Sequence, residues 1–134
     1  MKKTKDLKLN IYQAIRNKYS QTQNIDPLIL RFRELIRSEN NIQKPLEYYA
    51  DVLKVSQTKL YLVTKAELKI TPREFVREIL ITEILENLVS TEIRLKELCY
   101  GFGFPAPASL TKFIKTATGY SPSKYRALNC IKDK

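Results

Sequence analysis

The chain has 134 residues, of which 43% are hydrophobic, and a formal net charge of +10. That length fits one domain, or two small helical subdomains that share a connecting helix. The sequence contains no histidine, which excludes His-based catalytic triads, His metal ligands and Cys/His zinc fingers. No stretch approaches the roughly 18 apolar residues of a membrane span, and the Lys-rich start lacks the apolar segment of a signal peptide. We therefore expect a cytoplasmic protein without a metal, a cofactor or a membrane partner.

The positive charge favours a polyanionic partner, because Lys and Arg neutralise phosphates and release condensed counterions. Half of the excess positive charge lies in the first 20 residues. We interpret residues 1–25 as a basic arm or linker. Such an arm either embraces DNA backbone or is a solvated tail. The charged residues of this stretch are Lys2, Lys3, Lys5, Lys8, Arg16 and Lys18 against Asp6.

Three helices are predicted between residues 26 and 70. Asp26 followed by Pro27 is typical of a helix start, since aspartate caps the first turn and proline fits its first position. Apolar residues at helical spacing carry this helix to about residue 40. Pro45 precedes a short second helix, and Ser56 is placed to cap a third, which extends to about Leu68.

A long helix and three short ones follow. Thr71-Pro72 repeats the cap and proline, and Glu74 completes a capping box, in which two side chains bond each other's backbone N–H. The long helix covers residues 73–89, about 26 Å at 1.5 Å per residue. Shorter helices are predicted over about 95–102, 107–118 and 122–128. No period-two alternation or hairpin turn competes, so the predicted class is all-α.

A short helix, a tight turn and a second helix occur twice. The first unit begins at Ala50 and the second at Cys99, and a hydrophobic residue, Val55 or Phe104, follows each turn. A small residue allows two helices to cross closely, and we expect the Cys99 thiol to be buried there as a small hydrophobe. A helix-turn-helix has this layout: the first helix braces the second, whose outward face enters the major groove.

The second unit carries the more specific motif. It opens at Gly103-Phe104 and closes with Gly119-Tyr120-Ser121-Pro122-Ser123-Lys124-Tyr125-Arg126, and Tyr49-Ala50-Asp51-x-Leu53-x-Val55-Ser56 fits the first unit. With these motifs, residues 27–128 resemble the DNA-binding domain of AraC/XylS-family transcription regulators. The resemblance implies two helix-turn-helix subdomains, 26–70 and 90–128, joined by a connecting helix over 71–89, with a tail at 129–134. Lys69 departs from the family, which commonly has glycine there.

The resemblance also implies which residues face DNA. They lie on the outward sides of the two second helices: Thr58, Lys59, Tyr61, Leu62 and Lys65 in the first unit, and Pro107, Ala108, Ser109, Thr111, Lys112 and Lys115 in the second, with Arg126 able to reach phosphate. The family often has Arg or Gln at such positions, which bond guanine or adenine bidentately. Leu62, Pro107 and Ala108 can only touch thymine methyl groups. The lysines are alternatively an ordinary solvated face, and we expect Tyr48, Tyr49, Tyr100 and Tyr120 to be buried or half-buried.

The leading hypothesis is a sequence-specific, double-stranded DNA-binding transcription regulator that contacts RNA polymerase, as the family suggests. The chain is then either a stand-alone regulator that binds as a monomer or a fragment of a larger protein. The alternatives are a helical protein-interaction module and a non-specific nucleic-acid-binding protein that has lost specific readout. An enzyme is the least expected, since the sequence offers no catalytic constellation and no phosphate-cradling glycine loop. A DNA reader should gather Lys and Arg on the face that bears both second helices.

Overall fold

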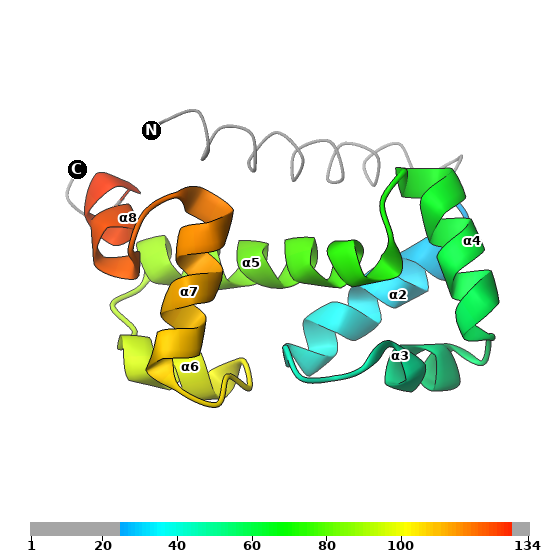
Figure 1. Ribbon diagram of the computed structural model, residues 1–134, viewed down its shortest axis with the longest axis horizontal. Coiled ribbons are helices and arrows are strands. Elements are labelled where there is room, and N and C mark those ends of the chain that lie inside the picture. The colour runs from blue at the N-terminus through cyan, green and yellow to red at the C-terminus, as the bar shows by residue number, and fades with distance from the viewer. Residues whose placement is uncertain (1–24, 130–134) are drawn as a thin grey trace.

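The computed structural model describes residues 25–129 (Figure 1). The basic arm and Cys130 lie outside these residues, so what we expected of the arm stays a prediction. The described chain is all-α and has no strand, which confirms the predicted class. Its helices are α2 (Pro27–Glu39), α3 (Leu46–Leu53), α4 (Gln57–Leu68), α5 (Pro72–Ser90), α6 (Leu95–Gly101), α7 (Pro107–Thr118) and α8 (Pro122–Asn129).

The predicted helix starts are present with their capping bonds. The Asp26 carboxylate accepts a hydrogen bond from the Leu28 N–H at 2.9 Å. The Thr71 hydroxyl accepts from the Glu74 N–H at 3.1 Å, and the Glu74 carboxylate accepts from the Thr71 N–H at 2.9 Å. Each bond satisfies a backbone N–H that the helix itself leaves without a partner. These caps fix where α2 and α5 begin.

Left-handed residues end the helices and turn the chain. Gly103, in the second turn, and Gly119, at the end of α7, have φ angles of 78° and 85°. The first unit has Lys54 and Lys69 at the corresponding places, with φ angles of 61° and 67°. A residue with a Cβ is strained at such positive φ angles, so Lys54 and Lys69 lower the stability of the first unit.

The long helix α5 is shared by both halves of the molecule (Figure 1). Helices α2 and α4 pack against one end of it, and α7 and α8 against the other. In the first half, the Phe32 ring lies edge-on to the rings of Tyr49 and Phe75, at centroid distances of 5.6 and 5.3 Å. In the second, Cys99 is fully buried with a free thiol, as predicted. One apolar core therefore continues along α5 through both helix-turn-helix units.

The two units also touch directly, away from α5. The loop between α2 and α3 reaches the turn between α6 and α7, where the Gln43 side-chain amide donates to the Gly103 carbonyl. From α5, the Arg77 guanidinium lies 4.9 Å above the Phe113 ring of α7, a cation–π contact. The first contact ties the two units together directly, and the second holds α7 against α5.

Candidate nucleic-acid interface

Helices α4 and α7 are equivalent in register. Each has 12 residues, begins after an extended N-cap residue and ends at a left-handed C-cap, Lys69 or Gly119. Counting from Gln57 and Pro107, the fully buried Leu60 of α4 corresponds to the fully buried Leu110 of α7. The outward faces of the two helices can therefore be compared position by position.

The outward face of α4 carries the five residues expected from the sequence. Thr58, Leu62 and Lys65 form its central row at helical spacing i, i+4, i+7, and all three are exposed. Tyr61 and Lys59 lie on the two flanks and are exposed as well. The Ser56 hydroxyl accepts a hydrogen bond from the Lys59 N–H at 3.0 Å, which fixes the start of this face. The inward side of α4 is held by Leu60 and Thr64, which are fully buried.

The outward face of α7 has Ala108, Lys112 and Lys115 as its central row, all exposed. Thr111 and Ser109 lie on its flanks. They are half-buried and therefore less accessible than the exposed lysines. A shallow hollow runs along this face, lined by Ala108, Thr111, Lys112, Lys115 and Thr116. The sequence-predicted residues of the second unit thus share one surface, with the exposed Pro107 at the start of the helix.

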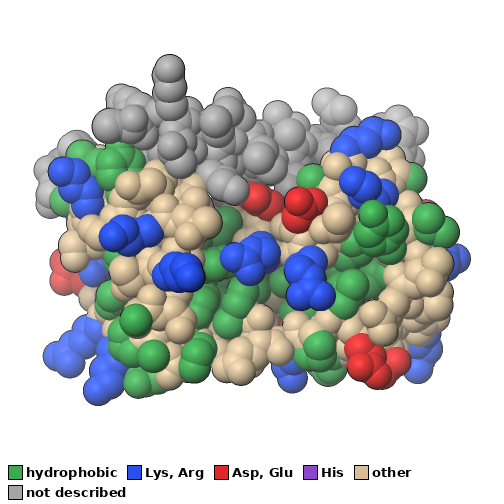
Figure 2. Space-filling view, viewed as in Figure 1, with side chains coloured by type: hydrophobic (Ala, Val, Ile, Leu, Met, Phe, Trp, Pro, Cys, Tyr) green, Lys and Arg blue, Asp and Glu red, His purple; other side chains and the backbone are tan. Residues whose placement is uncertain are grey.

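Helix α7 crosses α5 near one end, and α4 lies beside the other end, roughly parallel to α7 in this view (Figure 1). Figure 2 shows Lys and Arg side chains spread across this face from α7 over α5 to α4, with acidic side chains in its upper middle and at its edges. The sequence contributes to this pattern, because no Asp or Glu occurs between Asp51 and Glu67 or between Glu97 and Asn129. The charge distribution is the one that a DNA reader requires.

Arg126 lies elsewhere. Its Nε donates to the Leu88 carbonyl at 2.6 Å and its Nη2 to the Ile93 carbonyl at 2.7 Å. These bonds attach α8 to the end of α5 and to the segment that follows it, so the guanidinium is engaged in holding the second unit together. The expectation for Tyr100 was wrong: its side chain is 56% exposed. Tyr48, Tyr49 and Tyr120 are buried or half-buried, as expected.

Sequence reasoning missed four residues on this side of the molecule. Ala66 and Thr116 are exposed at equivalent positions of the two outward faces, and the helical period alone would have indicated them. Arg73 and Arg77 are exposed on α5 between the two units. Their position followed only from the tertiary arrangement, because the sequence does not say which side of the connecting helix faces α7.

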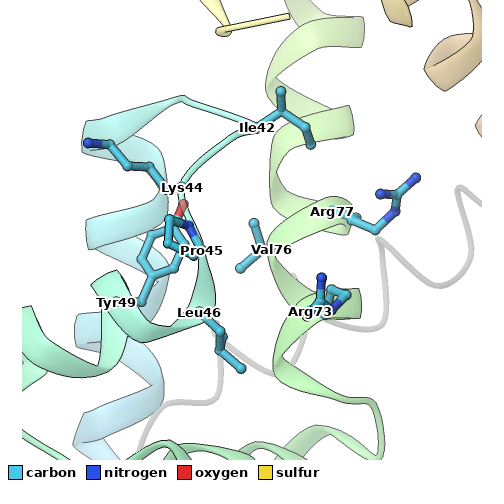
Figure 3. Close-up of a pocket in the computed structure, with 8 residues that line it drawn as sticks. All are labelled: Ile42, Lys44, Pro45, Leu46, Tyr49, Arg73, Val76 and Arg77. Atoms are coloured by element: carbon cyan, nitrogen blue, oxygen red, sulfur yellow. The ribbon is translucent and has the colours of Figure 1, made fainter.

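A small cavity of about 90 Å³ lies between the α2–α3 loop, α3 and α5, and Ile42, Lys44, Pro45, Leu46, Tyr49, Arg73, Val76 and Arg77 line it. Figure 3 shows Val76 pointing from α5 toward Tyr49, while Arg77 extends away on the other side of the helix. Tyr49 is fully buried, and its hydroxyl has no hydrogen-bond partner within residues 25–129. Burial raises the pKa of this hydroxyl to about 12.

Other kinds of site find no support in the described part of the chain. Residues 25–129 contain no cluster of His, Cys, Asp or Glu that could hold a metal ion. None of the helices described here is long and apolar enough to cross a membrane.

A bracing helix, a turn and an outward-facing basic helix, repeated on one long helix, define a double helix-turn-helix DNA-binding module. A family model described as "Helix-turn-helix domain" matches residues 49–128. The chain belongs to this family, which is of the AraC type. Histidine kinase P4 of Formosa agariphila is 29% identical over 104 residues, which cover 76% of this chain and 8% of that protein. The chain thus spans a small part of that relative's length.

Solved structures share the fold. The C-terminal domain of AraT, a response regulator from Geobacillus stearothermophilus, superposes with a TM-score of 0.73 and 28% identity, covering 81% of this chain and 91% of that one. The xylose-binding transcription activator XylR matches with a TM-score of 0.72 and 20% identity, over 81% of this chain and 28% of that one. The C-terminal domain of the response regulator YesN from Fusobacterium nucleatum matches with a TM-score of 0.66, 19% identity and coverages of 75% and 99%.

Proposed function

We propose that this chain is the sequence-specific DNA-binding module of a transcription regulator. In this proposal α4 and α7 enter successive segments of the major groove on one side of the duplex, about one helical turn or 34 Å apart. Helix α5 has 19 residues and is therefore about 28 Å long, which suits that separation. The observation that carries the proposal is the equivalent register of α4 and α7, which are packed on one shared helix and both turn an exposed, basic side outward.

Within the interface, the lysines and the other outward-facing residues have different roles. Lys59, Lys65, Lys112 and Lys115 contact phosphates, which position the protein without reading sequence. Thr58 on α4 and Thr111 on α7 face base edges, together with Tyr61, Leu62 and Ser109. Arg126 supports α7 indirectly, through the bonds that fix α8 to the end of α5.

The proposal extends to the setting in which the module acts. Two of the solved relatives are response regulators and one matched relative is a histidine kinase, and XylR is a transcription activator. These names support a role as the DNA-binding output of a signalling pathway in the cytoplasm. One copy of the chain has both helix-turn-helix units and so binds as a monomer, and activation proceeds through contact with RNA polymerase.

Selection of bound fragments from genomic DNA, followed by titration at several salt concentrations, tests the proposal. We expect a shared bipartite motif, bound about 1,000-fold or more above random DNA. Lys115→Ala should weaken binding to every sequence and lower the salt dependence by about one released counterion. Lys96→Ala is the matched control, because Lys96 is exposed on α6 and outside both outward faces.

One outcome would contradict the proposal. Binding that ignores sequence and disappears at modest salt would overturn specific readout and leave a basic scaffold. In that case the exposed hydrophobic residues of the surface would favour a protein partner instead. They are Val52, Tyr61, Leu62, Tyr100 and Leu128.

A further inference from the structure

The centre of the outward face of α4 is apolar. Leu62, the middle residue of its central row, is 61% exposed, and the adjacent Tyr61 is 44% exposed. Figure 2 shows hydrophobic side chains gathered over α4 with Lys and Arg beside them. Large apolar side chains grouped on a surface mark an interaction site more often than isolated ones do.

The equivalent positions of α7 have a different chemistry. Counted from the first residue of each helix, Leu62 corresponds to Lys112 and Tyr61 corresponds to Thr111. The two helices are alike in their left-handed C-caps, their buried leucines and their basic residues at the last outward turn. They differ at these two middle positions, which are apolar or aromatic in α4 and polar in α7.

The surroundings of Leu62 favour DNA over a protein as its partner. Lys59 and Lys65 flank it on the same helix and are exposed, and no acidic residue occurs between Asp51 and Glu67. An apolar strip between cations complements a groove lined by phosphates. Leucine has no hydrogen-bonding group, so the one feature of a base edge that it recognises in the major groove is the C5 methyl of thymine.

We propose that the two helices read different base chemistry: α4 recognises thymine methyl groups with Leu62 and Tyr61, whereas α7, with Lys112 on phosphate, relies on polar contacts from Thr111 and Ser109. This inference rests on the proposed function and specifies its substrate. The operator then has a half-site under α4 that contains thymine at its central positions. Discrimination there comes from packing against methyl groups, and Thr58 adds the hydrogen bond next to them.

Replacing thymine with deoxyuridine tests this directly, because it removes only the C5 methyl and leaves base pairing unchanged. In the α4 half-site of the selected operator, each critical replacement should weaken binding about fourfold, the effect of exposing one buried methyl group. The same replacement in the α7 half-site is the control and should change affinity less. The Thr58→Ala variant identifies the α4 half-site by the base preference that it alters.

The Leu62→Ala variant completes the test. Leu62 is exposed, so the variant should fold, and it should bind the thymine and deoxyuridine operators with nearly equal affinity. A specific operator that binds equally well with deoxyuridine, or whose α4 half-site has no thymine, overturns the inference and leaves the proposed function standing. Absence of any specific operator overturns both.

Discussion

The backbone N–H of Ile42 donates a hydrogen bond of 2.9 Å to the carbonyl of Phe102, which joins the first helix-turn-helix unit to the turn of the second. Beside it, the Gln43 side chain donates to the Gly103 carbonyl across 60 positions of sequence. Besides their packing on α5, the two units are thus held to each other directly. The contact between the α2–α3 loop and the second turn adds to the packing on α5 in holding α4 and α7 in one relative direction.

Gly103→Ala should break this contact. Gly103 has a φ of 78°, and a Cβ there would lie 2.3 Å from Oδ1 of Asn41, whose side chain is held by a 2.8 Å bond from the Gln43 N–H. We expect the free energy of unfolding to fall by about 2 kcal/mol, from left-handed strain and the displaced loop. Urea denaturation measures the change, and hydrogen exchange at the Ile42 amide should accelerate.

Gly101→Ala is the control for that experiment. Gly101 lies at the end of α6, and nothing stands within 4 Å of the Cβ that alanine would add. The free energy of unfolding of the Gly101→Ala variant should be equal to or slightly above that of the unmodified chain, since alanine favours the helix. Equal losses in the two variants would contradict a specific role for the contact at Gly103.

Arg126→Ala should destabilise the second unit. The change removes two charge-assisted bonds to the carbonyls of Leu88 and Ile93, and we expect a loss of about 2 kcal/mol in unfolding experiments. Arg126→Lys keeps the charge but has one nitrogen, so it should recover little of the loss. A stable Arg126→Ala variant with a reduced salt dependence of DNA binding would instead indicate a phosphate contact.

Tyr49→Phe should stabilise the protein and change its response to alkali. Tyr49 is fully buried with no partner for its hydroxyl within residues 25–129, so its removal should increase the free energy of unfolding by about 1 kcal/mol. Burial raises the pKa of Tyr49 from 10.0 to about 12. A raised pKa means that the folded state holds its proton more tightly than the unfolded state does. The linked stability is therefore complete below pH 10 and is lost as the pH rises toward 12.

Urea denaturation between pH 8 and pH 12 compares the two chains. The loss of stability above pH 10 should be smaller in Tyr49→Phe than in the unmodified chain, because the other titrating groups are common to both. Parallel curves for the two chains would show that Tyr49 does not titrate differently on folding.

Lys69→Gly should also stabilise the protein. Lys69 ends α4 with a φ of 67°, where Gly119 ends α7 with a φ of 85°. Glycine avoids the left-handed strain, and a gain of about 1 kcal/mol should raise Tm by about 4 °C. Gly119→Ala is the reciprocal variant and should lower Tm. No gain from Lys69→Gly would mean that the lysine side chain offsets the strain of its backbone.

Much of the fold could be predicted from local patterns. Asp26, Ser56 and Thr71 cap helices where the sequence expected them, because capping depends on residues within one turn. The equivalence of the two units was visible in Val55 and Phe104, which follow the two turns, and the structure extends it to the buried Leu60 and Leu110. These features are encoded in short stretches and do not depend on the rest of the chain.

The rest depends on contacts that sequence patterns do not show. The hydrogen bond between Ile42 and Phe102 uses backbone groups, so no side-chain pattern in the sequence predicts it. Arg126 resembles a phosphate-binding residue in its motif, but its carbonyl partners come from segments more than thirty positions away. Tyr100 is exposed although it follows the buried Leu98 and Cys99, because the short α6 has only one side against the core.

The spacing of the two half-sites tests the central claim most directly. In the selected operator, insertion of about five base pairs between the half-sites turns them to opposite sides of the duplex, and about ten restore the phase. We predict that both insertions reduce affinity to that of a single half-site, because α5 and the Ile42–Phe102 contact hold α4 and α7 at one separation. Undiminished affinity for either insertion would contradict an account in which one rigid chain reads both half-sites.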